Sequence, residues 1–202
     1  IDEKFRFLGF RVAPSSQPYQ FKYNLREEKV IKEQLQNTAL LSYLLYENGK
    51  IAVDELTPDD RFGSQVNYNT ALPSRSIGKS LTSYLLAHAI CSGYIESVDT
   101  KLDDWNWVKG TVYEGQTLID LVNMRAGDQE FAYTNRIFFP DKSDRNIRFQ
   151  PLASTYKRLK NTKPSKRFYN YNDLTVNTVV NYIRFKTGYK YQEFTTNFLQ
   201  NK

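Results

Sequence analysis

A serine and a lysine lie three residues apart where a helical pattern begins, at Ser76 and Lys79. Residues at this spacing share one face of an α-helix, with roughly 5–6 Å between their Cβ atoms, so a lysine amine can reach the serine hydroxyl. A serine hydroxyl is a weak nucleophile until a neighbouring base takes its proton. The pair therefore indicates nucleophilic acyl transfer, while two polar residues in a first helical turn are the simpler interpretation.

The residues from Ser76 up to Gly93 are predicted to form the helix that positions this pair. Apolar residues recur at helical spacing, and Gly93 lies where a C′ glycine would end the helix. The N-terminus of a helix offers free N–H groups and the positive end of the helix dipole. Both would lie close to Ser76, where negative charge develops on a substrate oxygen during acyl transfer.

Two other chemistries match these residues less well. Gly78-Lys79-Ser80 resembles the end of a phosphate-binding P-loop, but Pro73 takes the place of its first glycine and the stretch before it is polar. The only histidine, His88, lies twelve residues along the same helix. At 1.5 Å per residue it is about 18 Å from Ser76, which excludes a Ser-His-Asp triad. The base must therefore be a lysine, a tyrosine or a carboxylate.

A second polar cluster precedes another predicted helix, in the run Phe168-Tyr169-Asn170-Tyr171-Asn172-Asp173. A tyrosine from this run, placed beside a lysine ammonium, could serve as the base. The alternative is aromatic packing with Asn172 or Asp173 as the helix N-cap. For the aspartate taken alone, the cap is the better explanation.

Composition limits the function classes. The chain has 202 residues, of which 40% are hydrophobic and 15% aromatic, so it is globular with a sizeable core. No apolar run approaches the roughly 20 residues of a membrane span, so stable membrane insertion is not expected. A single cysteine excludes an internal disulfide, and Cys91 is predicted to be a core residue. Residues 142–167 carry nine basic side chains and one acid but no recognisable nucleic-acid module, so a solvated segment and no nucleic-acid partner are expected.

The predicted elements are early strands followed by helices, which indicates an α+β fold with helices packed on a sheet. Two strands should pair around the Asn48-Gly49 turn. Two strands alone are marginal, so either Phe5–Val12 adds a strand or the chain stops before the sheet is complete. An irregular stretch is expected at 128–167. The predicted helices lie at about 24–35 (capped by Asn24 and Glu27), from Thr117 to near Gly127, at 176–187 and at 191–199.

Several of these motifs, taken in order, resemble the serine β-lactamase and penicillin-binding-protein-like superfamily. The resemblance is nearest to its branch of class C β-lactamases, esterases and 6-aminohexanoate-dimer hydrolases. Lys186-Thr187-Gly188 spells the family's third box, but it closes a predicted helix and is rejected as catalytic. The matching stretches are Leu44–Ile51, Arg75–Leu81, Cys91–Ile95 with Lys101-Leu102, Thr117–Gly127 and Arg167–Asp173.

The resemblance implies a β-lactamase-like fold, with an antiparallel sheet flanked by helices and a helical subdomain. Residues 1–202 would then be the N-terminal part of one domain, with an extension at 1–39 and the family match at 40–202. The true third box is expected beyond Lys202. The 202 residues alone should therefore show little or no acyl transfer. A periplasmic or secreted location is favoured by the same resemblance.

The resemblance also implies a covalent acyl-enzyme at Ser76, formed from a small-molecule ester or amide. Lys79 and Tyr171 would share the role of base, and the backbone N–H of Ser76 would supply half of the oxyanion hole. Asn123, Asn172 and Asp173 are expected to bind substrate, although relatives often carry Asn or Ser where this chain has Asp173. No cofactor and no metal are expected.

Two further points stay open at the level of sequence. The same fold could serve binding alone, as a non-catalytic penicillin-recognising protein. The basic side chains of Lys163, Lys166 and Arg167 would suit a substrate carboxylate.

Overall fold

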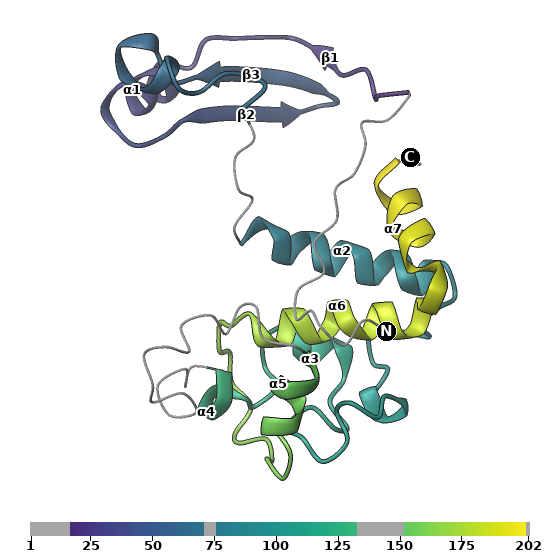
Figure 1. Cartoon of the computed structure of the whole chain (residues 1–202). Coiled ribbons are helices and arrows are strands. Elements are labelled where there is room, and N and C mark those ends of the chain that lie inside the picture. The colour runs from purple at the N-terminus through teal and green to yellow at the C-terminus, as the bar shows by residue number, and fades with distance from the viewer. Residues whose placement is uncertain (1–16, 71–75, 133–151, 201–202) are drawn as a thin grey trace. The chain divides into compact units, whose positions relative to one another are not determined.

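The computed structural model describes residues 17–70, 76–132 and 152–200 of the chain. This part is α+β, as the sequence predicts, and it forms two compact units (Figure 1). The first, a sheet unit, lies within residues 14–74, and the second, a helical unit, lies within residues 75–202.

The sheet unit is built around the predicted hairpin. Strand β2 (Ser42–Glu47) pairs antiparallel with β3 (Lys50–Leu56). The two turn residues, Asn48 and Gly49, have φ of 49° and 76°. Positive φ at both positions is what an Asn-Gly hairpin turn requires, so the local sequence is sufficient to specify this pair.

The sheet is mixed rather than antiparallel, which corrects the expectation. A third strand, β1 (Lys22–Tyr23), pairs parallel with β3, and the strand order is β1-β3-β2. The chain passes through helix α1 (Lys29–Asn37) and β2 before it reaches β3, so β1 and β3 run in the same direction. The other candidate strand, Phe5–Val12, lies outside the described residues.

Helix α1 begins later than the sequence predicts. The backbone N–H groups of Asn24 and Arg26 donate to the carbonyls of Ile51 and Ala52, each at 2.9 Å. These residues continue the pairing with β3, so they do not enter a helix, and the predicted capping box at Asn24 is wrong. Pairing with a distant strand overrides the local signal. A short π-helical turn (Asp59–Gly63) follows β3, and Gln65–Thr70 forms turns, not the strand that a P-loop needs.

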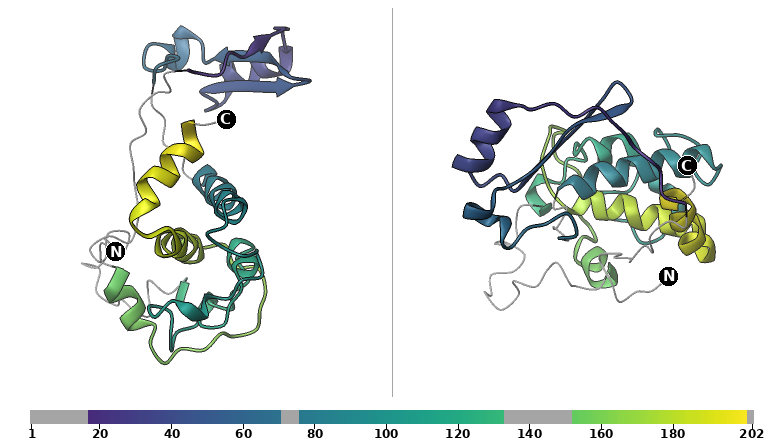
Figure 2. Two further views of the ribbon diagram at one scale, coloured as in Figure 1. Left: turned by 90° about the vertical axis from the view of Figure 1, so that its right-hand side faces the viewer. Right: turned by 90° about the horizontal axis from the view of Figure 1, so that it is seen from above.

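The helical unit contains the other helices. Helices α2 and α6 lie side by side, with α3 against α6 and α7 against the ends of both (Figure 2). Two 3₁₀ turns, Leu102–Asp104 and Gly188–Lys190, connect the longer elements. The helix bounds are α2 Ile77–Cys91, α3 Leu118–Val122, α4 Gln129–Ala132, α5 Leu152–Arg158, α6 Leu174–Thr187 and α7 Tyr191–Gln200.

An aromatic core holds α2 and α6 in place. The ring of Trp105 lies 5.5 Å from that of Tyr156 and 5.9 Å from that of Tyr182, and all three side chains are buried. Leu86 of α2 and Ile183 of α6 belong to the same buried cluster. The core thus joins segments that are far apart in the sequence and fixes the helices that carry the candidate site.

Two predicted helix ends are confirmed, whereas a third helix end and one predicted core residue are wrong. Gly93 and Gly188 follow α2 and α6 with positive φ of 75° and 58°, as predicted for helix-ending glycines. Lys186-Thr187-Gly188 therefore closes a helix, as expected. Cys91, predicted in the core, is exposed, because at about 100° per residue it lies on the side of α2 opposite the buried Leu86 and Ala89. Helix α3 ends at Val122 and not near Gly127, since Met124 takes a positive φ of 53°.

An ion pair at the far end of α6 makes stability depend on pH. Asp104 accepts hydrogen bonds from the Tyr182 hydroxyl at 2.9 Å and from the Lys186 ammonium at 2.8 Å. Partial burial would raise the pKa of Asp104, but these two bonds outweigh it and hold that pKa below its usual range. A carboxyl with a lowered pKa stabilises the fold above its unfolded pKa, near 4, and this contribution is lost as the pH falls.

We therefore expect Asp104→Asn to lower the free energy of unfolding at pH 7 by about 1 kcal/mol or less, because solvent screens the half-exposed carboxylate. Urea unfolding at pH 7 and at about pH 3 measures the effect. The difference between variant and wild type should shrink at the lower pH. An equal difference at both pH values would contradict this assignment.

Candidate active site

Ser76 lies at the start of α2 with its side chain free of the capping role. Its backbone has helical angles, φ −71° and ψ −11°, and its hydroxyl makes no capping hydrogen bond. The hydroxyl oxygen instead accepts a hydrogen bond from the hydroxyl of Tyr171. Ser76 is therefore more than a polar residue of the first helical turn. Its hydroxyl bonds a side chain that is 95 residues away in the chain.

Tyr171 reaches Ser76 from the segment just before α6. The backbone N–H of the preceding Asn170 donates to the carbonyl of Met124 at 2.8 Å, which ties this segment to the loop after α3. The side chain of Tyr171 is 42% exposed, so the site is accessible to solvent and to a small ligand. Tyr169, the other candidate tyrosine, is 64% exposed. The structure thus brings the hydroxyl of Tyr171 to Ser76, and its role as a base stays a prediction.

Lys79 completes the cluster from the next turn of α2. Its ammonium lies 5.0 Å from the centroid of the Tyr171 ring, within the range of a cation–π contact. The same ammonium donates to the carboxylate of Asp173. The backbone N–H of Lys79 donates to the carbonyl of Ser76 at 3.0 Å, but among the described contacts their side chains share no hydrogen bond, so the Tyr171 side chain links the two.

The side chain that caps the N-terminus of α6 belongs to Asn172 and not to Asp173. Asp173 precedes α6 but makes no capping hydrogen bond, because its carboxylate pairs with Lys79. Asn172 does the capping instead, since its amide oxygen accepts from the backbone N–H of Thr175 at 3.0 Å. The cap was the better explanation of the aspartate from the residues alone, and it is wrong for Asp173.

The other two predicted substrate-binding residues, Asn172 and Asn123, differ in how far their side chains are exposed to solvent. Asn172 is buried, and its amide nitrogen donates to the carbonyl of Asn170 at 2.8 Å and to Asp128 at 3.4 Å. Asn123 follows the end of α3 and is exposed. Binding of substrate by these two asparagines stays a prediction, and Asn123 is the one with a side chain open to solvent.

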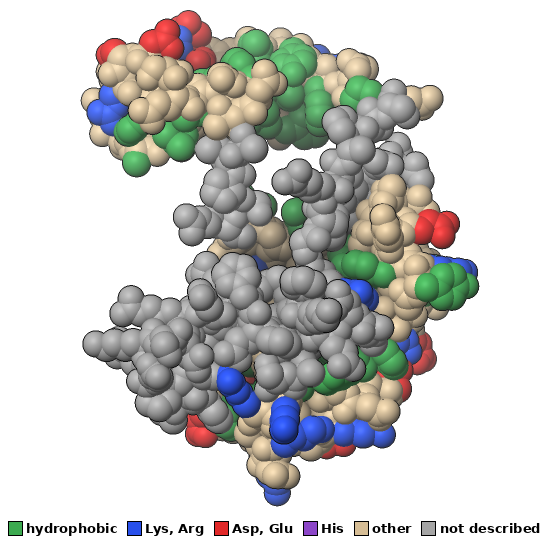
Figure 3. Space-filling model, viewed as in Figure 1, with side chains coloured by type: hydrophobic (Ala, Val, Ile, Leu, Met, Phe, Trp, Pro, Cys, Tyr) green, Lys and Arg blue, Asp and Glu red, His purple; other side chains and the backbone are tan. Residues whose placement is uncertain are grey.

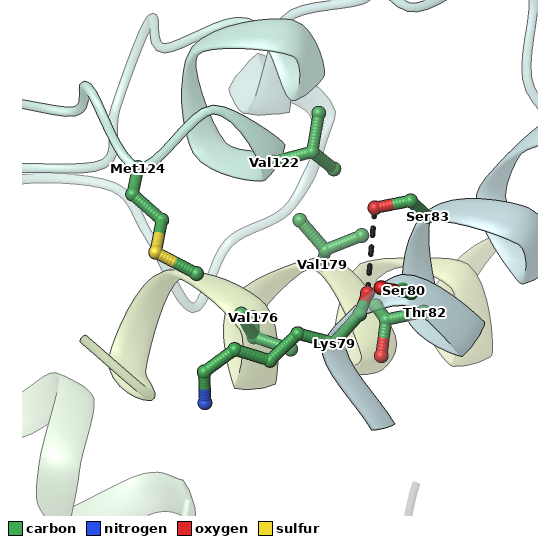
Figure 4. Close-up of a pocket in the computed structure, with 8 residues that line it drawn as sticks. All are labelled: Lys79, Ser80, Thr82, Ser83, Val122, Met124, Val176 and Val179. Atoms are coloured by element: carbon green, nitrogen blue, oxygen red, sulfur yellow. Dashed lines mark hydrogen bonds between the residues drawn. The ribbon is translucent and has the colours of Figure 1, made fainter. Parts of the chain in front are cut away.

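A small cavity of about 160 Å³ lies beside Lys79 (Figure 4). The stem of Lys79 runs along one side of it, and the amine lies at the end away from Ser83. The walls combine apolar side chains of α3, of the loop after it and of α6 with hydroxyls of α2. They are formed by Lys79, Ser80, Thr82, Ser83, Val122, Met124, Val176 and Val179.

One buried acid near the site was missed by sequence reasoning. Asp128 is fully buried, and its carboxylate accepts a hydrogen bond from the Tyr113 hydroxyl at 2.6 Å as well as the bond from Asn172. Burial raises the pKa of Asp128, and these hydrogen bonds oppose that rise. Its partners lie 15 and 44 residues away, so no local pattern marks an aspartate in this position as special.

The basic stretch is more ordered than expected where it is described. Helices α4 and α5 lie in the stretch predicted to be irregular, while 133–151 are outside the described residues. Lys and Arg side chains gather around α5 on the face seen in Figure 3. Arg167 pairs with Asp120 at 2.7 Å, so one of the three cations proposed for a substrate carboxylate has a protein partner. The role of Lys163 and Lys166 stays a prediction.

Among the described residues, no group of three or more His, Cys, Asp or Glu side chains is arranged to hold a metal ion. In the same residues, no helix combines the length and apolar character that a membrane span requires. His88, excluded from a triad by its distance, stacks on Phe194 with ring centroids 5.1 Å apart. In comparisons with known proteins, no family model matches the chain, and no curated protein matches it in sequence.

Proposed function

We propose that this chain carries the nucleophile and the proton-transfer groups of a serine hydrolase, which forms an acyl-enzyme at Ser76 and cleaves an ester or a non-peptide amide. The observation that carries the proposal is the hydrogen bond between the hydroxyls of Tyr171 and Ser76, with the Lys79 ammonium against the same tyrosine ring. A nucleophile within hydrogen-bond reach of a base, which a third group orients, is the arrangement that activates a serine.

In the acylation step, the Tyr171–Lys79 pair would begin with one proton fewer, as a Tyr171 phenolate beside the Lys79 ammonium, and Ser76 Oγ would attack the substrate carbonyl carbon while its proton passes to the phenolate oxygen. The carbonyl π electrons move onto the oxygen, which the N-terminus of α2 stabilises through its N–H groups and dipole. The tetrahedral intermediate then breaks its bond to the leaving group, and the pair returns the proton to that group. Tyrosine and lysine would act as one unit, because the Lys79 ammonium lies against the ring whose hydroxyl exchanges the proton with Ser76.

In the deacylation step, water would attack the acyl-enzyme and repeat the sequence. The pair takes a proton from the water, the ester bond to Ser76 breaks, and the serine oxygen regains a proton. The product is a free carboxylic acid. The ammonium of Lys79, held by Asp173, would stabilise the Tyr171 phenolate that takes the proton from Ser76 in acylation and from water in deacylation.

The β-lactamase-like fold is part of the same proposal. It is supported by the order of the motifs and by where they lie: Ser76 and Lys79 open α2, Tyr171 precedes α6, and the Asn48-Gly49 hairpin joins two strands. A carboxylate at Asp173, which pairs with Lys79, differs from the neutral residue common in relatives. This difference bears on which esters or amides are accepted.

The proposal is tested on the full-length protein by hydrolysis of short-chain 4-nitrophenyl esters. Ser76→Ala should lower kcat/KM by at least about 10³-fold, because the nucleophile is lost. Ser92→Ala, at the opposite end of the same helix, is the matched control and should leave kcat/KM unchanged.

Turnover that survives in Ser76→Ala would refute the proposal. Reversible, saturable binding of a penicillin with no turnover and no covalent adduct would instead favour the alternative function, a non-catalytic binding protein.

A further inference from the structure

The buried carboxylate of Asp128 lies directly behind the segment that carries Tyr171. Its Oδ2 accepts from the hydroxyl of Tyr113, which is also fully buried, and its Oδ1 accepts from the amide of Asn172. The buried amide nitrogen of Asn170 faces the same carboxylate without a hydrogen bond of normal geometry. Side chains on both sides of Tyr171 are therefore directed at this one acid.

Asn172 carries this connection into the backbone. Its amide nitrogen donates both to Asp128 and to the carbonyl of Asn170, and its amide oxygen accepts from the N–H of Thr175 in the first turn of α6. One side chain thus joins the residue before Tyr171 to the start of the helix after it. An amide has two donor hydrogens and two acceptor lone pairs, and Asn172 uses both hydrogens inside the protein.

A buried carboxylate is destabilising unless donors satisfy it. Burial raises the pKa of Asp128, so the site carries a real cost in stability. An apolar residue would fill the same space without that cost. What an apolar residue would not do is accept the hydrogen bonds of Tyr113 and Asn172 and so fix the turn that lies against the nucleophile.

We infer that Asp128 is a positioning residue of the proposed acyl transfer: through Asn172 it holds the turn at residues 170–173, so that Tyr171 meets Ser76 and Asp173 meets Lys79. The inference rests on the proposed function for its catalytic consequence. The structural part of the inference, that Asp128 holds the turn at residues 170–173, is independent of the proposed function.

Two substitutions at Asp128 separate a positioning role from a role of the charge. An asparagine is nearly the same shape, its amide oxygen can accept from Asn172, and its amide nitrogen can donate to the Tyr113 hydroxyl, which also accepts. Asp128→Asn should therefore keep the turn and rescue most of the activity. Asp128→Ala removes both acceptors and leaves Asn172 unpaired on that side.

Two buried tyrosines whose hydroxyls donate to carboxylates provide a matched control. Tyr113 donates to Asp128 at 2.6 Å, and Tyr182 donates to Asp104 at 2.9 Å at the far end of α6. Each Tyr→Phe change removes one buried hydroxyl that bonds a carboxylate. Tyr113→Phe should loosen the turn at 170–173, whereas Tyr182→Phe should lower stability alone.

The experiment uses the full-length protein and two readouts, ester hydrolysis and amide hydrogen exchange of the peptide spanning residues 168–176. In Asp128→Ala we expect kcat to fall about 10–100-fold at nearly constant KM, since misplacing a catalytic group by about 1 Å has effects of this size. Exchange of the 168–176 peptide should speed up in Asp128→Ala and Tyr113→Phe. Asp128→Asn should stay within about threefold of wild type in kcat.

The outcomes are distinguishable. Unchanged exchange at 168–176 in Asp128→Ala, or an equal loss of kcat in Tyr182→Phe, would overturn the inference. A loss in Asp128→Asn as large as in Asp128→Ala would also overturn it, because the charge and not the placement would then matter. If the unaltered protein shows no turnover, the proposed function falls, and exchange alone decides whether Asp128 holds the turn.

Discussion

Replacing Tyr171 by phenylalanine is expected to reduce kcat/KM for ester hydrolysis by about 10²–10⁴-fold, the usual contribution of a general base. The change removes only the hydroxyl that bonds Ser76. The ring that lies against the Lys79 ammonium stays, so the free energy of unfolding should change little. Initial rates with a short-chain 4-nitrophenyl ester, together with thermal unfolding, measure both quantities.

Tyr169→Phe is the matched control for this prediction. Tyr169 is in the same aromatic run, two residues earlier, and is the more exposed of the two tyrosines. Removal of the Tyr169 hydroxyl should leave kcat/KM at the wild-type value. Equal effects of the two changes, or full activity in Tyr171→Phe, would show that Tyr171 is not the base.

Gly127→Ala is expected to have the largest effect on stability. Gly127 has a φ of +70°, and a Cβ built on it would lie 2.5 Å from the backbone carbonyl oxygen of Ser165. The N–H of Ser165 donates to the Gly127 carbonyl at 2.8 Å, so the two backbones are held close together. The left-handed conformation and the overlap together should lower the free energy of unfolding by about 2–4 kcal/mol.

Gly93→Ala isolates the conformational part of that effect. Gly93 has a similar φ of +75°, but nothing lies within 4 Å of its added Cβ. The expected loss is therefore about 1 kcal/mol. Urea unfolding of both variants gives the comparison. Equal losses at the two positions would mean that the close approach of Gly127 to Ser165 is absent. Because Asp128 follows Gly127, the first change should also disturb the hydrogen bonds of Asn172.

Features encoded within a few residues could be predicted from the sequence. The Asn48-Gly49 hairpin, the helix ends at Gly93 and Gly188 and the start of α3 at Thr117 are all local, and the structure confirms them. The start of α1 was predicted wrongly, because residues near Asn24 pair with β3 instead of capping a helix. The parallel strand β1 escaped prediction for the same reason: it exists only through a partner far along the chain.

Some parts of the candidate site could likewise be predicted from local sequence, and others could not. Ser76 and Lys79 follow from their spacing, and the order of motifs pointed to Tyr171, which the structure brings to the serine. The pairing of Asp173 with Lys79 and the burial of Asp128 depend on how α2, α3 and α6 pack, so no local pattern contains them. Cys91 is a case in which a local pattern was misleading. Its apolar neighbours predict burial, but its place on the helix leaves it exposed.

The most direct test of the central claim is to map the residue that a fluorophosphonate probe modifies. The full-length protein is treated with the probe, digested and analysed by tandem mass spectrometry. An activated nucleophile reacts far faster than an ordinary serine hydroxyl. We predict one modified residue, Ser76, with slower modification in Tyr171→Phe and none in Ser76→Ala. Modification of a different serine, or of none in the folded protein, would contradict the assignment of Ser76 as the nucleophile.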